Sequence, residues 1–204
     1  MRNFSSITRV CYLYKGNTDL NEISIRLKQI PILTDVELYQ NGTICFLVIR
    51  GKFQKEIDIE IEQVIDSITG DYRNKTLKNL ELIFKKNIAN KPQIKNEFQR
   101  IVVTLELEND PKLRSEYIEI HHPANIWLEI ISNMNFIGIE DMELYLYKYR
   151  AFLLMDTKID FDKLGKIWAD LPREKEWQKY VSKFQKVNSN DKTIDKWIRM
   201  QRLK

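Results

Sequence analysis

The feature that most constrains the fold is a repeat within the chain. Two segments of equal length align, TDVELYQNGTICFLVIRG at residues 34–51 and EDMELYLYKYRAFLLMDT at residues 140–157. Both contain Asp-x-Glu-Leu-Tyr and, further on, Phe-Leu. We interpret this repeat as an old duplication, so the chain is expected to fold as two similar halves.

The first half follows a recognisable order of elements. Alternating apolar residues predict a strand, and a later Asn-Gly between two such runs predicts a β-hairpin. Apolar residues at helical spacing predict a helix before the hairpin, whereas the segment after it fits a helix or a strand by period, and its length and position favour a helix. The expected elements are a strand over 6–14, a helix over 20–30, a hairpin over 35–50, a helix over 57–68 and a closing strand over 77–86. This β-α-β-β-α-β order is that of a ferredoxin-like α+β motif.

The second half repeats the plan with an insertion after its first strand. We expect a strand over 99–107, helical stretches over 113–122 and 126–136, a strand pair over 141–157, helices over 161–171 and 174–185, and a last strand over 196–203. A polar link, NIANKPQIKNE, joins the halves. The predicted domains are therefore residues 1–90, without site residues, and residues 98–204.

Composition excludes several classes of partner. The net charge of +4 is small, and lysine and arginine alternate with acidic residues, whereas nucleic-acid binding needs a basic patch on one face. The first residues lack the apolar core of a signal peptide, and no apolar run approaches the ~18 residues of a membrane span. Neither CxxC nor HxxxH occurs. We therefore predict a cytoplasmic protein without metal, nucleic acid or membrane as partner.

The two cysteines, Cys11 and Cys45, both lie in apolar runs that are predicted to be strands. Cysteine in such a run behaves as a small buried apolar residue. We expect buried free thiols here; a disulfide or a reactive site is the alternative.

Both histidines of the chain lie side by side in EYIEIHHPANIWLEI, residues 116–130. Tyr117 precedes His121 by four residues, so on a helix the two side chains share a face. The imidazole is the side chain whose ordinary pKa suits proton transfer near neutral pH. His122 points elsewhere on a helix. His121 is therefore a candidate acid or base, and the alternative is that it caps and packs a helix end.

With these motifs in view, the second half resembles the L-rhamnose and L-fucose mutarotase family, from about residue 98 to residue 203. The family's strand followed by Tyr-x-x-x-His and Trp-Pro-Glu is matched by RIVVTLEL, Tyr117 to His121 and Trp127-Leu128-Glu129. Its middle hairpin is matched by DMELYLYKYRAFLLMD, its late tryptophan helix by KEWQKYVSKFQ and its last strand by KWIRMQRL.

The resemblance implies a fold and an activity. Members have a ferredoxin-like α+β fold that pairs into a dimeric barrel, so the degenerate first half is expected to supply the partner sheet of a pseudo-dimer within one chain. Such chains can pair further as a homodimer. Members interconvert the α and β anomers of a deoxy-hexose by opening the ring. The expected partner is thus a small monosaccharide, and the chemistry needs no cofactor.

The resemblance also implies roles for side chains. His121 is expected to transfer the proton, with Tyr117 sharing it or orienting the imidazole. Trp177 and Tyr180, three residues apart on the late helix, are expected to form a wall for the apolar side of the sugar. Plain packing is the alternative for each of these residues.

Two further residues are weaker candidates for binding the sugar. Trp127 is expected to line the pocket or to anchor a helix, and Asp156 to hold a sugar hydroxyl or to end a strand in solvent. The sequence departs from the family at Leu128, where members have proline, and at Gln178, where many have a second tryptophan. A more polar wall and a different preferred sugar are expected from the second departure.

Two other functions remain open. The degenerate first half and the altered tryptophan pair are also compatible with a non-catalytic sugar-binding or interaction protein. A different enzyme on the same barrel, such as a cofactor-independent monooxygenase or a haem-degrading protein, is the second alternative.

Overall fold

A computed structural model describes residues 8–15, 19–51, 54–69, 77–86, 98–186 and 197–203. The chain divides into two compact units. The first unit comprises residues 1–80 and 200–204, and the second comprises residues 81–199. The polar link predicted over 87–97 lies outside the described residues.

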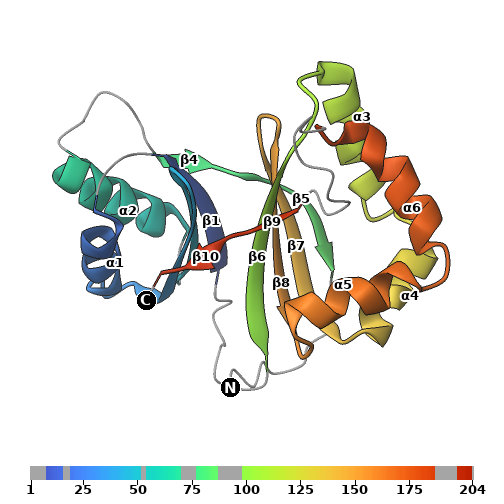
Figure 1. Cartoon of the computed structure of the whole chain (residues 1–204). Coiled ribbons are helices and arrows are strands. Elements are labelled where there is room, and N and C mark those ends of the chain that lie inside the picture. The colour runs from blue at the N-terminus through green and yellow to red at the C-terminus, as the bar shows by residue number, and fades with distance from the viewer. Residues whose placement is uncertain are drawn as a thin grey trace, which may run out of the picture. The chain divides into compact units, whose positions relative to one another are not determined.

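The first unit is an antiparallel sheet with helices on one face. Its elements are β1 (Thr8–Lys15), α1 (Leu20–Lys28), β2 (Leu33–Asn41), β3 (Ile44–Gly51), α2 (Gln54–Thr69), β4 (Leu77–Asn79) and β10 (Gln201–Arg202). The strand order is β10-β2-β3-β1-β4. Helices α1 and α2 lie on one face of this sheet (Figure 1). Their apolar side chains, such as Leu27 and Ile61, pack with Leu38 and Leu47 of the sheet.

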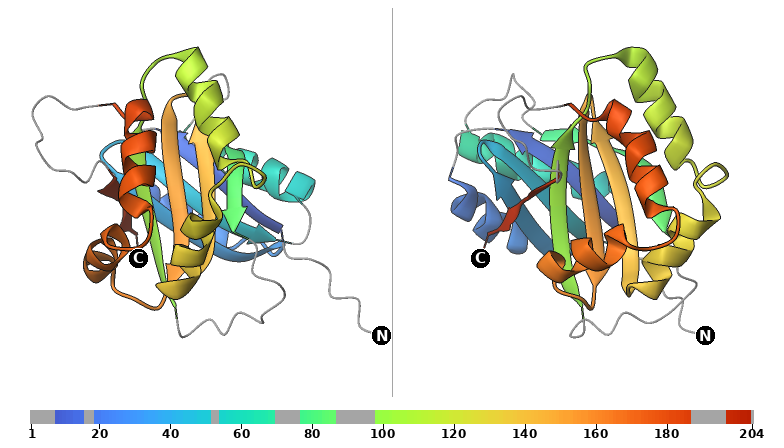
Figure 2. Two further views of the ribbon diagram at one scale, coloured as in Figure 1. Left: turned by 90° about the vertical axis from the view of Figure 1, so that its right-hand side faces the viewer. Right: turned by 45° about the vertical axis from the view of Figure 1, so that its right-hand side comes forward.

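The second unit has the same plan with additional helices. Its elements are β5 (Glu81–Lys86), β6 (Gln99–Glu106), α3 (Pro111–His121), α4 (Leu128–Phe136), β7 (Ile139–Tyr147), β8 (Arg150–Thr157), α5 (Phe161–Ala169), α6 (Glu174–Val181), a 3-10 turn (Ser182–Phe184) and β9 (Ile198–Arg199). The strand order is β5-β7-β8-β6-β9. All four helices contribute to one core on one face of this sheet (Figure 2). Two ferredoxin-like halves are thus confirmed.

The closing strand of each half differs from its prediction, because each is divided between two sheets. β4 pairs with β1 of its own half, but β5, which is separated from β4 by a single residue, pairs with β7. In the same way β9 pairs with β6, and β10 pairs with β2. Each sheet therefore gains an outer strand from the segment that closes the other half, which satisfies the backbone groups of an otherwise open edge.

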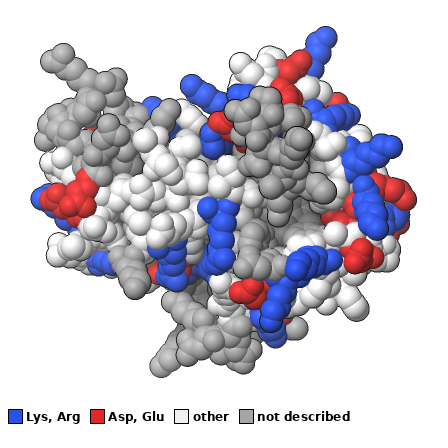
Figure 3. Space-filling model, in the orientation of Figure 1, with Lys and Arg blue, Asp and Glu red and all other residues white. Residues whose placement is uncertain are grey.

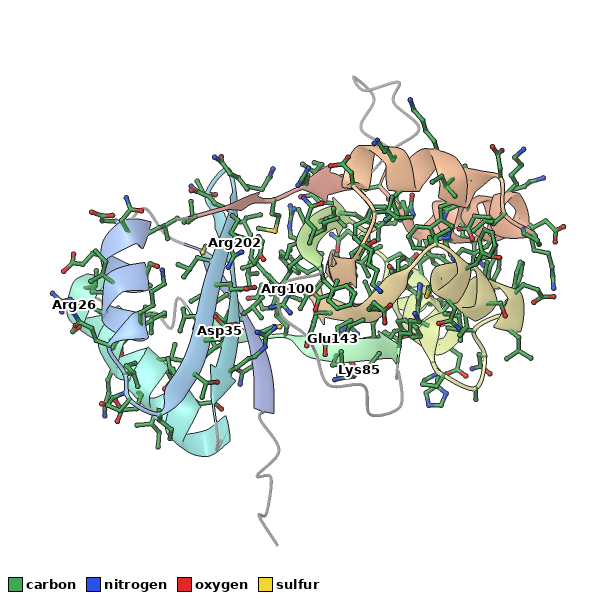
Figure 4. The ribbon with its side chains drawn as sticks, turned by 90° about the horizontal axis from the view of Figure 1, so that it is seen from below. Arg26, Asp35, Lys85, Arg100, Glu143 and Arg202 are labelled. Carbon is green, nitrogen blue, oxygen red and sulfur yellow. The ribbon has the colours of Figure 1, made fainter. Side chains whose placement is uncertain are left out.

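The repeated segments occupy equivalent strand pairs and make equivalent bonds. The hydroxyl of Tyr39 donates to Glu37 at 3.1 Å, and the hydroxyl of Tyr145 donates to Glu143 at 2.8 Å. A cation from the outer strand meets each carboxylate. Arg202 lies 3.1 Å from Glu37 and Lys85 lies 2.9 Å from Glu143; the second pair is labelled in Figure 4.

The hairpin turns of the two copies also match. Gly42 has φ +58°, the left-handed region that the predicted Asn-Gly turn requires, so the predicted hairpin is confirmed. In the aligned position of the second copy, Lys148 has φ +53°. The left-handed backbone conformation is thus present at both aligned positions, although lysine, unlike glycine, has a Cβ atom.

Both cysteines are buried and neither forms a disulfide, as predicted: Cys11 lies on β1 and Cys45 on β3. Burial raises the pKa of the Cys45 thiol to about 12. None of the described helices has the length and apolar composition needed to cross a membrane.

Candidate functional site

The candidate site begins with α3, whose ends are set by local sequence. Asp110 caps the helix, since its carboxylate accepts from the backbone N–H groups of Lys112 at 2.7 Å and Leu113 at 3.1 Å. The helix stops at His121 because His122 is already extended, as favoured for a residue before proline. His122 is exposed. His121 is thereby placed at the C-terminal end of a capped helix.

The imidazole of His121 is anchored on its own helix. Its Nδ1 lies 2.7 Å from the carbonyl oxygen of Tyr117, one turn earlier. Because a carbonyl only accepts, we assign the proton to Nδ1, which leaves Nε2 with a free lone pair. Only 8% of the residue is exposed, and this burial lowers the pKa of His121 to about 4, although the bond to the carbonyl acts in the opposite direction. At neutral pH the ring is therefore a neutral base.

Tyr117 lies directly beside this imidazole. The two ring centroids are 4.3 Å apart, and the tyrosine also meets Phe184 edge-on at 5.6 Å. Burial raises the pKa of Tyr117 well above its ordinary value of 10. Its hydroxyl therefore stays protonated across the physiological range.

Three further aromatic residues pack against one another next to His121. We call these residues, Trp127, Trp177 and Tyr180, the aromatic wall. Trp177 meets the imidazole edge-on, with centroids 5.6 Å apart. Trp127 lies 5.3 Å from Trp177 and is nearly parallel to Tyr180 at 6.2 Å. The wall thus joins the start of α4 to α6 and continues to the imidazole on α3.

Charged side chains flank the wall. The guanidinium of Arg173 lies 4.2 Å from the centre of a Trp127 ring. At the other end the Tyr180 hydroxyl donates to Glu116 at 3.3 Å, and Lys183 pairs with the same carboxylate. In Figure 3, basic and acidic side chains lie next to one another at the right of the view, where Figure 1 shows the helices of the second unit. Both outer rings of the wall are therefore held by polar contacts.

Comparison with known proteins decides the family. The family model described as L-rhamnose mutarotase matches residues 100–203. The chain belongs to the L-rhamnose mutarotase family. The matched range contains the whole aromatic wall and both His121 and Tyr117.

Individual relatives agree with this mutarotase family assignment. An L-fucose mutarotase of Xanthomonas campestris pv. campestris is 29% identical over 101 residues, which are 48% of this chain and 81% of that protein. A UPF0734 protein of Dictyostelium discoideum is 29% identical over 97 residues, covering 46% of this chain and 76% of that protein. Both alignments cover only about half of the chain.

Solved structures extend the likeness in fold to the whole chain. A putative monooxygenase of Fusobacterium nucleatum subsp. nucleatum superposes with a TM-score of 0.56 over 98% of this chain and 94% of its own, at 13% identity. At such low identity the likeness concerns the fold alone. The half of the chain that matches the mutarotase family is thus joined to a first half of related fold.

The two departures from the mutarotase family pattern lie on the surface. Leu128 begins α4 and is 80% exposed. Gln178 is also exposed, and its amide donates to Glu174 at 2.8 Å. A more polar wall at Gln178 stays a prediction.

Asp156 is not brought to the other candidates. On β8, Ala151 and Met155 face the helices, so alternation directs Asp156 to the opposite face of the sheet. Its carboxylate accepts two bonds of 2.7 Å from Arg100 on β6. A sugar-binding role for Asp156 stays a prediction, and its bonds favour a structural role.

Sequence reasoning missed two residues of this region, Arg173 and Glu174. Glu174 is buried, and desolvation raises its pKa, while bonds from Gln178 and Asn133 act in the opposite direction. A buried carboxylate at the first position of a helix has no signature in a single sequence. In the searched part of the chain, no group of three His, Cys, Asp or Glu side chains is placed to hold a metal ion.

Proposed function

We propose that the protein is a sugar mutarotase that interconverts the α and β anomers of a deoxy-hexose such as L-rhamnose or L-fucose. The observation that carries this proposal is the state of His121. Its imidazole is neutral, oriented through Nδ1 and flanked by aromatic rings, in the part of the chain that matches the mutarotase family. The ring is oriented to accept a proton without a cofactor, but a pKa of about 4 makes it a weaker base than an ordinary imidazole at neutral pH.

The reaction requires one proton to move and one bond to break. Nε2 of His121 accepts the proton of the hydroxyl on C1 while the bond between C1 and the ring oxygen opens. The imidazolium then gives its proton to the ring oxygen, leaving the open-chain aldehyde. Rotation about the bond between C1 and C2, followed by the reverse steps, closes the other anomer with no net gain or loss of atoms.

Neighbouring side chains divide the remaining tasks. Tyr117 stays protonated, so it donates a hydrogen bond to a sugar oxygen or orients the imidazole, and it does not act as a strong acid. Trp127, Trp177 and Tyr180 offer apolar ring surface to the methyl side of a deoxy-sugar, as expected for a mostly apolar binding site with few polar groups.

The direct test is anomer exchange of L-fucose and L-rhamnose, followed by saturation-transfer NMR. We expect the protein to accelerate exchange and His121→Gln to lower the acceleration by roughly 100-fold or more, the usual contribution of general acid–base catalysis. His122→Gln is the matched control, because this neighbour is exposed. Equal exchange with and without the protein would reject the proposal for these sugars.

One observation favours a second candidate function. With 8% of His121 exposed, the imidazole offers little surface to a substrate. A protein that binds a sugar without opening its ring is the alternative that this burial supports. Calorimetry that detects binding of L-fucose, in a sample without accelerated exchange, would select it. A cytoplasmic location and a homodimer of pseudo-dimeric chains stay predictions.

A further inference from the structure

Arg173 has an unusual backbone for a residue with a Cβ atom. It precedes α6 with φ 60° and ψ 4°, in the left-handed region. Among the described residues, Lys148 in the β7–β8 turn is the other non-glycine residue with positive φ. Side chains disfavour this conformation, so it persists only where the surroundings hold it.

The side chain of Arg173 makes three contacts that hold it over α4. Its guanidinium carbon lies 4.2 Å from the centre of a Trp127 ring. Its Nη1 lies 3.2 Å from Glu129 on α4, and its Nε lies 3.3 Å from Glu176 on α6. One planar group thus stacks on an indole while pairing with carboxylates of two helices, which a lysine ammonium cannot reproduce.

These ion pairs are too exposed to explain the arrangement by stability. The side chains of Arg173, Glu129 and Glu176 are 43%, 44% and 65% exposed. Pairs in such surroundings contribute little to folding. The effect of these contacts is therefore sought in the position of the Trp127 indole.

Trp127 is the ring of the aromatic wall that Arg173 contacts. It is the N-cap residue of α4, and its side chain makes no capping bond. Its ring meets Trp177 at 5.3 Å, and Trp177 meets the imidazole of His121 at 5.6 Å. A continuous series of contacts therefore leads from Arg173 through two indoles to the proposed base.

We propose that Arg173 is a positioning residue of the candidate site, which orients Trp127 and, through it, the ring of Trp177 beside His121. Its effect on catalysis rests on the proposed function, but its effect on the indole does not. Glycine at position 173 distinguishes the role of the backbone from that of the side chain. It accepts the left-handed backbone conformation but has no guanidinium.

The test compares Arg173→Gly with Lys148→Gly. The second change also places glycine at a position of positive φ, but in the turn between β7 and β8. The readout is the indole N–H resonance of Trp127 in a ¹H–¹⁵N spectrum, assigned by its loss in Trp127→Phe. We expect Arg173→Gly to move and broaden this resonance, Arg173→Lys to move it less, and Lys148→Gly to leave it in place. An unchanged resonance in Arg173→Gly, or an equal shift in Lys148→Gly, overturns the proposal.

Kinetics provide the second readout. Misplacing the wall weakens binding of the sugar and of the transition state alike, so KM rises several-fold in Arg173→Gly while kcat stays close to that of the wild type. An unchanged KM in an active enzyme whose Trp127 resonance has moved overturns the role in the site. If the wild-type protein does not accelerate exchange, the proposed function fails, and the indole resonance alone decides the role of Arg173.

Discussion

The hydroxyl of Tyr145 lies 2.8 Å from the carboxylate of Glu143, two residues earlier on β7, and Tyr39 makes the same bond to Glu37 on β2. Both carboxylates are buried, at 1% and 8% exposure. A buried carboxylate is costly unless its oxygens are hydrogen-bonded. In each copy of the Glu-Leu-Tyr sequence, the tyrosine therefore donates a hydrogen bond to the buried carboxylate of the same copy.

Removing either tyrosine hydroxyl is expected to destabilise the fold. Tyr145→Phe removes the hydrogen bond that the Tyr145 hydroxyl donates to the Glu143 carboxylate, and we expect the free energy of unfolding to fall by about 1 kcal/mol. Tyr39→Phe is the matched change in the other copy. Urea unfolding of each variant measures the effect. Stability equal to that of the wild type would show that the hydroxyl is replaceable, for example by water.

Stability is expected to depend on pH through His121. Burial lowers its pKa from 6.5 to about 4 in the folded protein. Between these values the unfolded chain binds a proton that the folded chain does not, so folding is favoured fully above pH 6.5 and less as the pH falls towards 4. The loss amounts to roughly 3 kcal/mol at most.

The measurement for this prediction is urea unfolding between pH 4 and pH 7. Acidic residues also titrate in this range, so the informative quantity is the difference between the wild type and His121→Gln. That difference should depend on pH. A constant difference for His121→Gln would indicate an ordinary pKa at position 121.

The thiol of Cys45 is expected to be inert in the folded protein. Its pKa of about 12 leaves almost no thiolate at pH 8, and the thiolate is the reactive form. Reaction with a disulfide reagent should be at least about 100-fold slower in buffer than in urea, since a thiol of ordinary pKa becomes available on unfolding. Labelling of native protein at Cys45, located by mass spectrometry, would contradict this expectation.

Asp156 and Arg100 are expected to stabilise the second unit without taking part in sugar binding. Their side chains are 8% and 11% exposed, and Asp156→Asn removes the negative charge that the Arg100 guanidinium contacts through two hydrogen bonds. Asp156→Asn should lower the free energy of unfolding by roughly 3 kcal/mol. KM for the sugar should stay close to the wild-type value in the folded fraction. A large rise in KM would restore the sugar-binding role predicted from the sequence.

Local sequence determined most of the elements and part of the site. Asn41-Gly42 predicted a hairpin, and the helical spacing of Tyr117 and His121 predicted that they share a face; both are confirmed. These features depend on interactions within a few residues, such as turn geometry and neighbours one helical turn apart. Such interactions are readable from spacing because the chain itself brings the partners together.

The tertiary structure alone decided which edges the closing strands join and which rings meet. Backbone hydrogen-bonding groups are the same at every residue, so nothing in the segment 77–86 states that β4 and β5 belong to different sheets. The contact of Arg173 with Trp127 and the pairing of Asp156 with Arg100 join residues at least 46 positions apart in sequence. Such contacts depend on how whole elements pack, which local spacing does not encode.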